Sequence, residues 1–135
     1  MILVEICRGV YKIFALGDSP NRCQLLDFLD DLESNLQKDG DRVLALLKRV
    51  AREGPPKNPD ICHQIGNKIY QFSQGRLRVI WFYDEGKMII CTQGFIKKTP
   101  RTPQGEISNA KLAMKSYFEA KKSGLIEIIA VEEGE

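Results

Sequence analysis

The chain has 135 residues, of which 43% are hydrophobic, and its 20 Lys and Arg nearly balance its 18 Asp and Glu. This length suits a single folded domain with its own core. The sequence contains no run of about 18 apolar residues, so it predicts no transmembrane helix. Its first residues lack the basic segment of a signal peptide, so we expect a cytoplasmic protein without a membrane partner.

The charges are unevenly distributed along the chain. Residues 61–122 contain 11 Lys and Arg against 4 Asp and Glu, a local excess of +7, whereas residues 1–60 contain 9 against 10. A basic half beside a neutral half favours one surface for a polyanion such as RNA. The alternative is a lysine-rich helix whose charges simply face water.

The four cysteines, Cys7, Cys23, Cys62 and Cys91, are widely spaced and each lies in an apolar run. Because there is no Cys-x-x-Cys pair, we expect reduced thiols in a cytosolic protein rather than disulfides. His63 is the only histidine, and one histidine without further ligands does not make a metal site. The sequence therefore predicts no metal and no cofactor.

The first half predicts strands followed by two helices. Residues 2–16 alternate as in one strand or a pair of strands. Ser19 and Pro20 predict a helix start, as capping residue and first helical position. Residues 38–40 predict a break, and a second helix is expected over 41–53. The inward face of the first helix consists of Leu25, Phe28, Leu29, Leu32 and Leu36.

Residues 68–96 predict a three-stranded antiparallel meander. Three runs rich in β-branched and aromatic residues are separated by Gln74-Gly75 and Glu85-Gly86, whose glycines tolerate positive φ. A closing helix is predicted after Thr102, as cap, and Pro103, ending at Gly124. Residues 125–131 are apolar, and we leave open whether they add an edge strand, pair with a partner or stay mobile.

A charge within the apolar middle strand is the most informative feature. Arg78 lies inside the run 76–83, and a buried charge is costly unless it is paired or faces a cleft. Antiparallel pairing is expected to bring Arg78 close to Lys97 and Lys98 at the end of the next strand. Three fixed cations would grip a phosphate and stabilise a pentacovalent phosphorane. The alternative is an exposed basic strand end.

The same residues carry a resemblance to a known family. Arg78-Val-Ile-Trp-Phe-Tyr83, then Gly94-Phe-Ile-Lys-Lys-Thr-Pro100 and Ala110 in the closing helix, resemble the RelE/HigB-like toxins, and most closely their phage-derived branch. The resemblance implies an α+β fold with an N-terminal strand, a helical hairpin, an antiparallel-rich meander and a C-terminal helix. It implies one toxin domain over residues 1–124, with an apolar and then acidic tail over 125–135.

The resemblance also implies a function. Such a protein is the toxin of a type II toxin–antitoxin system and cuts messenger RNA on the ribosome by attack of a 2′-OH on the adjacent phosphodiester. Arg78 would hold the scissile phosphate, and Lys97 and Lys98 would stabilise developing charge. The expected partners are the RNA and an antitoxin, of helix-turn-helix type. The further side chains that would contact the RNA are Lys68, Tyr70, Arg76 and Arg101.

The chain departs from the family pattern in two places. At the end of the sheet, where many relatives have a histidine or tyrosine, this chain has Lys97, Lys98 and Thr99. Relatives that cleave RNA usually carry an ionisable side chain on the strand before the arginine strand, where this chain has Gln71 and Ser73, which are poor bases. The general base is therefore not identified. His63 is either that acid–base group or a surface histidine, and Tyr70 and Trp81 either stack on bases or pack in the core. The alternative functions are a non-enzymatic toxin on the same fold, such as a gyrase inhibitor, and an inactive phage relic.

Overall fold

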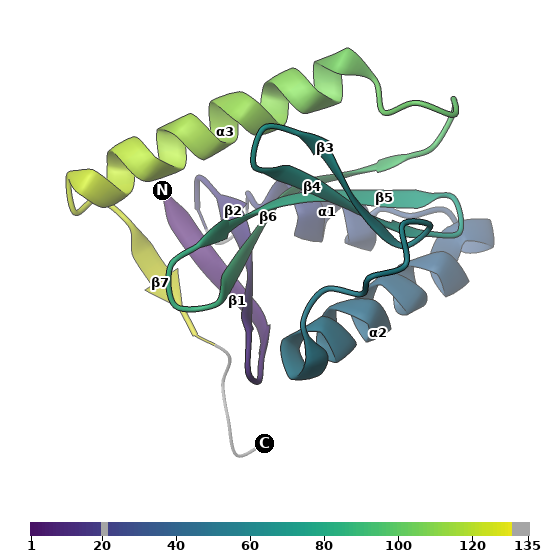
Figure 1. The fold of residues 1–135 in the computed structure, drawn as a ribbon, viewed down its shortest axis with the longest axis horizontal. Coiled ribbons are helices and arrows are strands. Elements are labelled where there is room, and N and C mark those ends of the chain that lie inside the picture. The colour runs from purple at the N-terminus through teal and green to yellow at the C-terminus, as the bar shows by residue number, and fades with distance from the viewer. Residues whose placement is uncertain (20–21, 131–135) are drawn as a thin grey trace.

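A computed structural model describes residues 1–19 and 22–130 as one seven-stranded sheet with helices on both faces (Figure 1). The strand order is β3-β4-β5-β6-β2-β1-β7. Helices α1 and α2 lie on one face and α3 on the other (Figure 1). The elements are β1 (Ile2–Arg8), β2 (Lys12–Gly17), α1 (Gln24–Asp30), the 3-10 turn η1 (Ser34–Leu36), α2 (Gln37–Glu53), β3 (Cys62–Gly66), β4 (Ile69–Gln74), β5 (Leu77–Asp84), β6 (Met88–Ile96), α3 (Gln104–Lys122) and β7 (Glu127–Ile129). The predicted α+β class is confirmed. No helix of the described ranges is long and apolar enough to cross a bilayer.

The predicted meander is confirmed as β4, β5 and β6. β5 pairs antiparallel with both neighbours, so Ser73 lies opposite Arg78 on one side and Phe95 on the other. Gly75 and Gly86 adopt φ of 55° and 73° in the two turns. Glycine reaches these angles without the steric cost of a side chain, and the tight turns therefore fix the register of the sheet.

The other half of the sheet is added by the ends of the chain. β1 and β2 form an antiparallel hairpin with a register shift between Glu5 and Cys7, and β2 pairs parallel with β6. β7 pairs parallel with β1 and forms an edge. Of the three possibilities left open for residues 125–131, residues 127–129 form an edge strand. Val131 lies outside the described residues.

The boundaries of the first two helices differ from the prediction. α1 begins after Cys23 rather than at Ser19 and already ends at Asp30, so Leu32 and Leu36 of the predicted face lie beyond it. Pro20 lies outside the described residues. The predicted break at 38–40 is wrong, because α2 already begins at Gln37 and runs through these residues. Gly40 is buried inside α2, and a Cβ there would come within 2.7 Å of Leu32 Cδ1. The glycine therefore makes room for a leucine instead of ending a helix.

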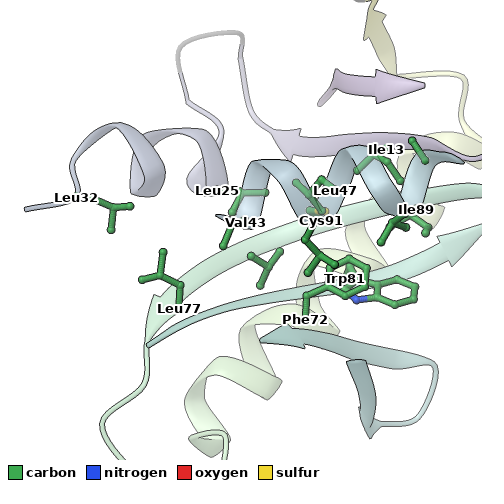
Figure 2. Packing of buried hydrophobic residues seen from close by; sticks show 14 of the residues in the cluster. Ile13, Leu25, Leu32, Val43, Leu47, Phe72, Leu77, Trp81, Ile89 and Cys91 are labelled. Carbon is green, nitrogen blue, oxygen red and sulfur yellow. The ribbon is translucent and has the colours of Figure 1, made fainter. Parts of the chain in front are cut away.

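The main core lies between the sheet and α1 and α2 (Figure 2). Trp81 is fully buried there, with its ring centroid 4.7 Å from Tyr70 and 4.8 Å from Phe72. Leu25 of α1 and Leu47 of α2 belong to the same cluster, so the two helices share one apolar layer. Trp81 is thus a core residue and cannot stack on a base.

A polar contact holds the far end of α3 on the opposite face. The Tyr117 hydroxyl donates to Asp84 Oδ2 at 2.5 Å, and Lys121 Nζ donates to the same carboxylate at 2.9 Å. Burial by itself would raise the pKa of Asp84, but these hydrogen bonds and that from the Glu85 amide lower it below the ordinary value of 3.8. The ionised carboxylate therefore stabilises the folded state.

Gly94→Ala should destabilise the protein. Gln24 brackets Gly94, since its side chain accepts from the Gly94 amide at 2.8 Å and donates to the Gly94 carbonyl at 3.2 Å. A Cβ at Gly94 would come within 2.5 Å of the Phe28 ring, so α1 must move. We expect a loss of about 1–3 kcal/mol in urea unfolding. Gly105→Ala is the control, because a Cβ there would meet nothing within 4 Å beyond its chain neighbours and its own helix backbone. Equal effects of both substitutions would contradict the packing argument.

Asp84→Asn should change the response to acid. The carboxyl binds its proton less readily in the folded than in the unfolded state, so its contribution is complete above the unfolded pKa and is lost as the pH falls through the folded value. We expect about 1–3 kcal/mol lower stability at pH 7 and a flatter decline below about pH 4. Glu85→Gln, in the same exposed turn, is the control. An acid decline in Asp84→Asn as steep as in the wild type would refute this role.

Candidate functional site

A cavity of about 440 Å³ lies on the α3 face of the sheet, near the N-terminal end of that helix. It is walled by β3, β4 and β5, by the loop after β6 and by the first turn of α3. Its lining residues are Pro59, Asp60, His63, Gln64, Ile65, Gln71, Ser73, Arg78, Pro100, Arg101, Thr102, Gln104 and Ile107. Polar side chains predominate, which suits a charged and hydrated ligand better than an apolar one.

Arg78 reaches this cavity from β5. Its neighbours in the strand, Leu77 and Val79, point into the core beneath α1 and α2, so alternation turns Arg78 to the α3 face. One guanidinium nitrogen donates to the carbonyls of Gly75 and Leu77, both at 2.8 Å. Burial lowers the pKa of Arg78, and within residues 1–19 and 22–130 no carboxylate pairs with it. The remaining donors are available to an anion in the cavity.

The two lysines after β6 do not share the surroundings of Arg78. The Lys97 amide donates to the Arg76 carbonyl at 2.7 Å, which extends the β5–β6 pairing by one residue. Lys97 therefore follows two residues after Phe95, the partner of Arg78, and its side chain is exposed. Lys98 faces a second cavity, on the α1 side. The structure thus places the Lys97 backbone beside Arg76, and neither Lys97 nor Lys98 lines the cavity that Arg78 enters.

The second cavity has a volume of about 560 Å³ and mixes charges of both signs. Arg76 and Lys98 line one wall, and Asp27, Asp31 and Glu33 line the other. These acidic residues are unfavourable for a nucleic acid backbone, because they repel phosphate. Of the two cavities, the one with Arg78 is the better candidate for a polyanion.

The remaining predicted RNA contacts are dispersed. Arg101 lines the Arg78 cavity. Tyr70 is half-buried against Trp81 on the opposite face of β4, and Lys68 occupies the turn between β3 and β4 with φ of 61°. The structure therefore groups Arg78 with Arg101 and leaves Lys68, Tyr70 and Arg76 elsewhere.

Sequence reasoning missed several residues of this cavity. Thr102 does not cap α3, whose N-cap is Pro103; its hydroxyl instead donates to Gln71 Oε1 at 2.7 Å and ties the loop to β4. Asp60, in the loop before β3, and Gln104, the first residue of α3, also line the cavity, and neither position carries a periodic signal in the sequence. Gln71 and Ser73, noted as departures from the family pattern, both face Arg78's cavity. His63, for which the sequence left open an acid–base group or a surface histidine, lines the cavity opposite Gln71 in the β3–β4 ladder.

The comparison with known families agrees with this architecture. The model of the family described as phage derived protein Gp49-like matches residues 27–115, about two thirds of the chain. The chain belongs to this family. The Gp49-like family is of the RelE toxin type, and the matched range includes every residue that lines the Arg78 cavity. None of the curated proteins matches the chain significantly.

Proposed function

We propose that this Gp49-like protein is the toxin of a type II toxin–antitoxin system and cleaves messenger RNA on the ribosome. The observation that carries the proposal is Arg78, a guanidinium without a carboxylate partner in the described part of the chain, facing a polar cavity. A planar, permanently charged fork matches two oxygens of a phosphate. Membership of a toxin-type family supports the same conclusion.

The reaction is attack of a 2′-OH on the adjacent phosphodiester, which leaves a cyclic phosphate and a 5′-OH. Arg78 holds the phosphate and stabilises the charge of the phosphorane, and Arg101 faces the same cavity. Lys97, exposed just beyond the sheet, and Lys98 dock the ribosomal RNA. Catalysis in this proposal comes from positioning the phosphate and stabilising its charge, because the sheet already fixes the hydrogen-bond donors of the chain.

The proposed partner in the cell is an antitoxin, of helix-turn-helix type, that covers the Arg78 face. The toxin acts in the cytoplasm, where the ribosomes are. Such a protein would deny the cavity to RNA and leave the toxin folded.

A second function is favoured by one observation. Gln71 and Ser73 face the cavity where relatives carry ionisable groups, and neither is a good base. On that ground, a toxin that binds its target without cleaving RNA, such as a gyrase inhibitor, is the alternative.

Arg78→Ala should abolish function without unfolding the protein. The side chain bonds only to carbonyls of its own turn, among the described contacts, so its loss leaves the core intact. We expect RNA cleavage, mapped by primer extension, to fall by about 10²–10³ and growth arrest to disappear. Arg78→Lys should restore little, because an ammonium lacks the two-pronged grip.

The control for Arg78 is Arg49→Ala, which removes an exposed arginine from α2. Circular dichroism checks the fold of each variant. A folded Arg78→Ala that still cleaves RNA and arrests growth would show that the site is elsewhere. Growth arrest by wild type without cleaved RNA would support the non-enzymatic toxin instead.

Affinity for RNA should fall steeply with salt. Each phosphate neutralised on a single strand contributes about −0.7 to the slope of log K against log salt concentration. Three or four cations of the basic half predict a slope of about −2 to −3 in fluorescence anisotropy titrations with labelled RNA. A slope near zero would contradict binding through phosphates.

A further inference from the structure

We propose that His63 is the general base of the RNA cleavage reaction. This inference rests on the function proposed above and names the group that the sequence pattern lacks. His63 lies on β3, which pairs with β4 and is separated from β5 by that one strand, and its neighbours in the sequence form no recognisable motif. Strand pairing is what brings it to Arg78.

The sheet register defines the arrangement. His63 lies opposite Gln71, and Ser73, two residues along β4, lies opposite Arg78. Residues two apart on a strand share a face, so all four side chains are on the α3 side, where all four line the cavity. With strands about 4.8 Å apart and about 3.3 Å per residue, the Cα atoms of His63 and Arg78 are roughly 12 Å apart. Arg78 Nη1 is held at the Gly75 and Leu77 carbonyls, so a phosphodiester in the cavity would lie between that guanidinium and the imidazole of His63.

The other lining residues are poorer bases. Arginine keeps its proton, which excludes Arg78 and Arg101, and the amides of Gln64, Gln71 and Gln104 do not titrate. Ser73 and Thr102 carry hydroxyls, and the Thr102 hydroxyl already donates to Gln71. Asp60 is a carboxylate, which is a weak base at neutral pH. An imidazole changes its charge near neutral pH and is the side chain best matched to proton transfer there.

The step balances with these groups and water. The 2′-oxygen forms a bond to phosphorus while its proton passes to an unprotonated ring nitrogen of His63. The bond from phosphorus to the 5′-oxygen breaks, and the leaving oxygen takes a proton from water. Arg78 donates to the phosphate oxygens throughout and exchanges no proton. His63 then returns its proton to solvent.

Several charged groups lie around His63. Asp60, Arg78 and Arg101 line the same cavity as His63, and Lys111 of α3 approaches Gly66 at the end of β3. Arginine and lysine side chains keep their proton and carboxylates stay ionised over most of the range between about pH 5 and 8. A pH dependence in that range therefore reports on the imidazole.

The test compares wild type, His63→Gln and His63→Ala in the cleavage of a short messenger RNA on programmed ribosomes. His63 is exposed on β3, so both substitutions should leave the fold unchanged. We expect kcat to fall by about 10²–10⁴ with KM nearly unchanged, and the decline of the wild-type rate from about pH 8 to 5 to disappear. Added imidazole should partly restore His63→Ala. Asn67→Ala, in the exposed turn after β3, is the control and should cleave as wild type does.

The outcomes separate this inference from the function on which it rests. If wild type cleaves RNA and His63→Gln cleaves at the same rate with the same pH profile, His63 is not the base and the endoribonuclease remains. A loss that appears in KM, with the wild-type pH profile retained, also overturns the inference, because it indicates a contact with RNA. If wild type does not cleave RNA, both proposals fail. If Asp60→Asn removes the pH dependence and His63→Gln does not, the carboxylate is the base.

Discussion

The hydrogen-bonded pairing of β5 with β4 and β6 is the constraint on which the rest of the molecule depends. β5 is covered on both faces: Val79 and Trp81 pack beneath α1 and α2, while Ile80 and Phe82 pack beneath α3. Its register is fixed by the turns at Gly75 and Gly86. Arg78 interrupts this apolar strand at the edge of the contact with α3, where its charged group lines a polar cavity instead of the apolar core. The strand at the centre of the core thus also orients Arg78 toward the cavity.

The two faces of the sheet have different electrostatic characters at this end. On the α3 side, Arg78 and Arg101 face polar side chains, whereas on the α1 side Lys98 and Arg76 face the carboxylates of α1 and the following turn. The Gly-Phe-Ile-Lys-Lys segment that resembles toxins runs between the two. Gly94, at its start, has a structural role, since it lets Phe28 and Leu25 approach β6. The motif therefore combines a glycine needed for packing with lysines that supply positive charge.

The sequence allowed the meander to be predicted, because runs of β-branched residues and turn glycines are local signals. The helix boundaries were missed for tertiary reasons: Gly40 is needed for Leu32, and Thr102 bonds to Gln71. Arg78 could be identified as a site residue from the sequence, because a charged residue inside an apolar strand stands out there. The position of His63 in the same cavity as Arg78 could not be predicted, because it depends on the pairing of β3 with β4. The divergence of Lys98 was also hidden, because it depends on which face the chain takes after β6.

The central claim is that the phosphate of RNA occupies the cavity between β3, β4, β5 and the start of α3. It is tested most directly by NMR, with isotope-labelled protein titrated at low salt with a 2′-O-methyl RNA oligonucleotide that cannot be cleaved. The account predicts that the largest shifts fall on the amides of His63, Ser73, Arg78 and Arg101. Shifts confined to Asp27, Arg76 and Lys98, on the other face of the sheet, would contradict it.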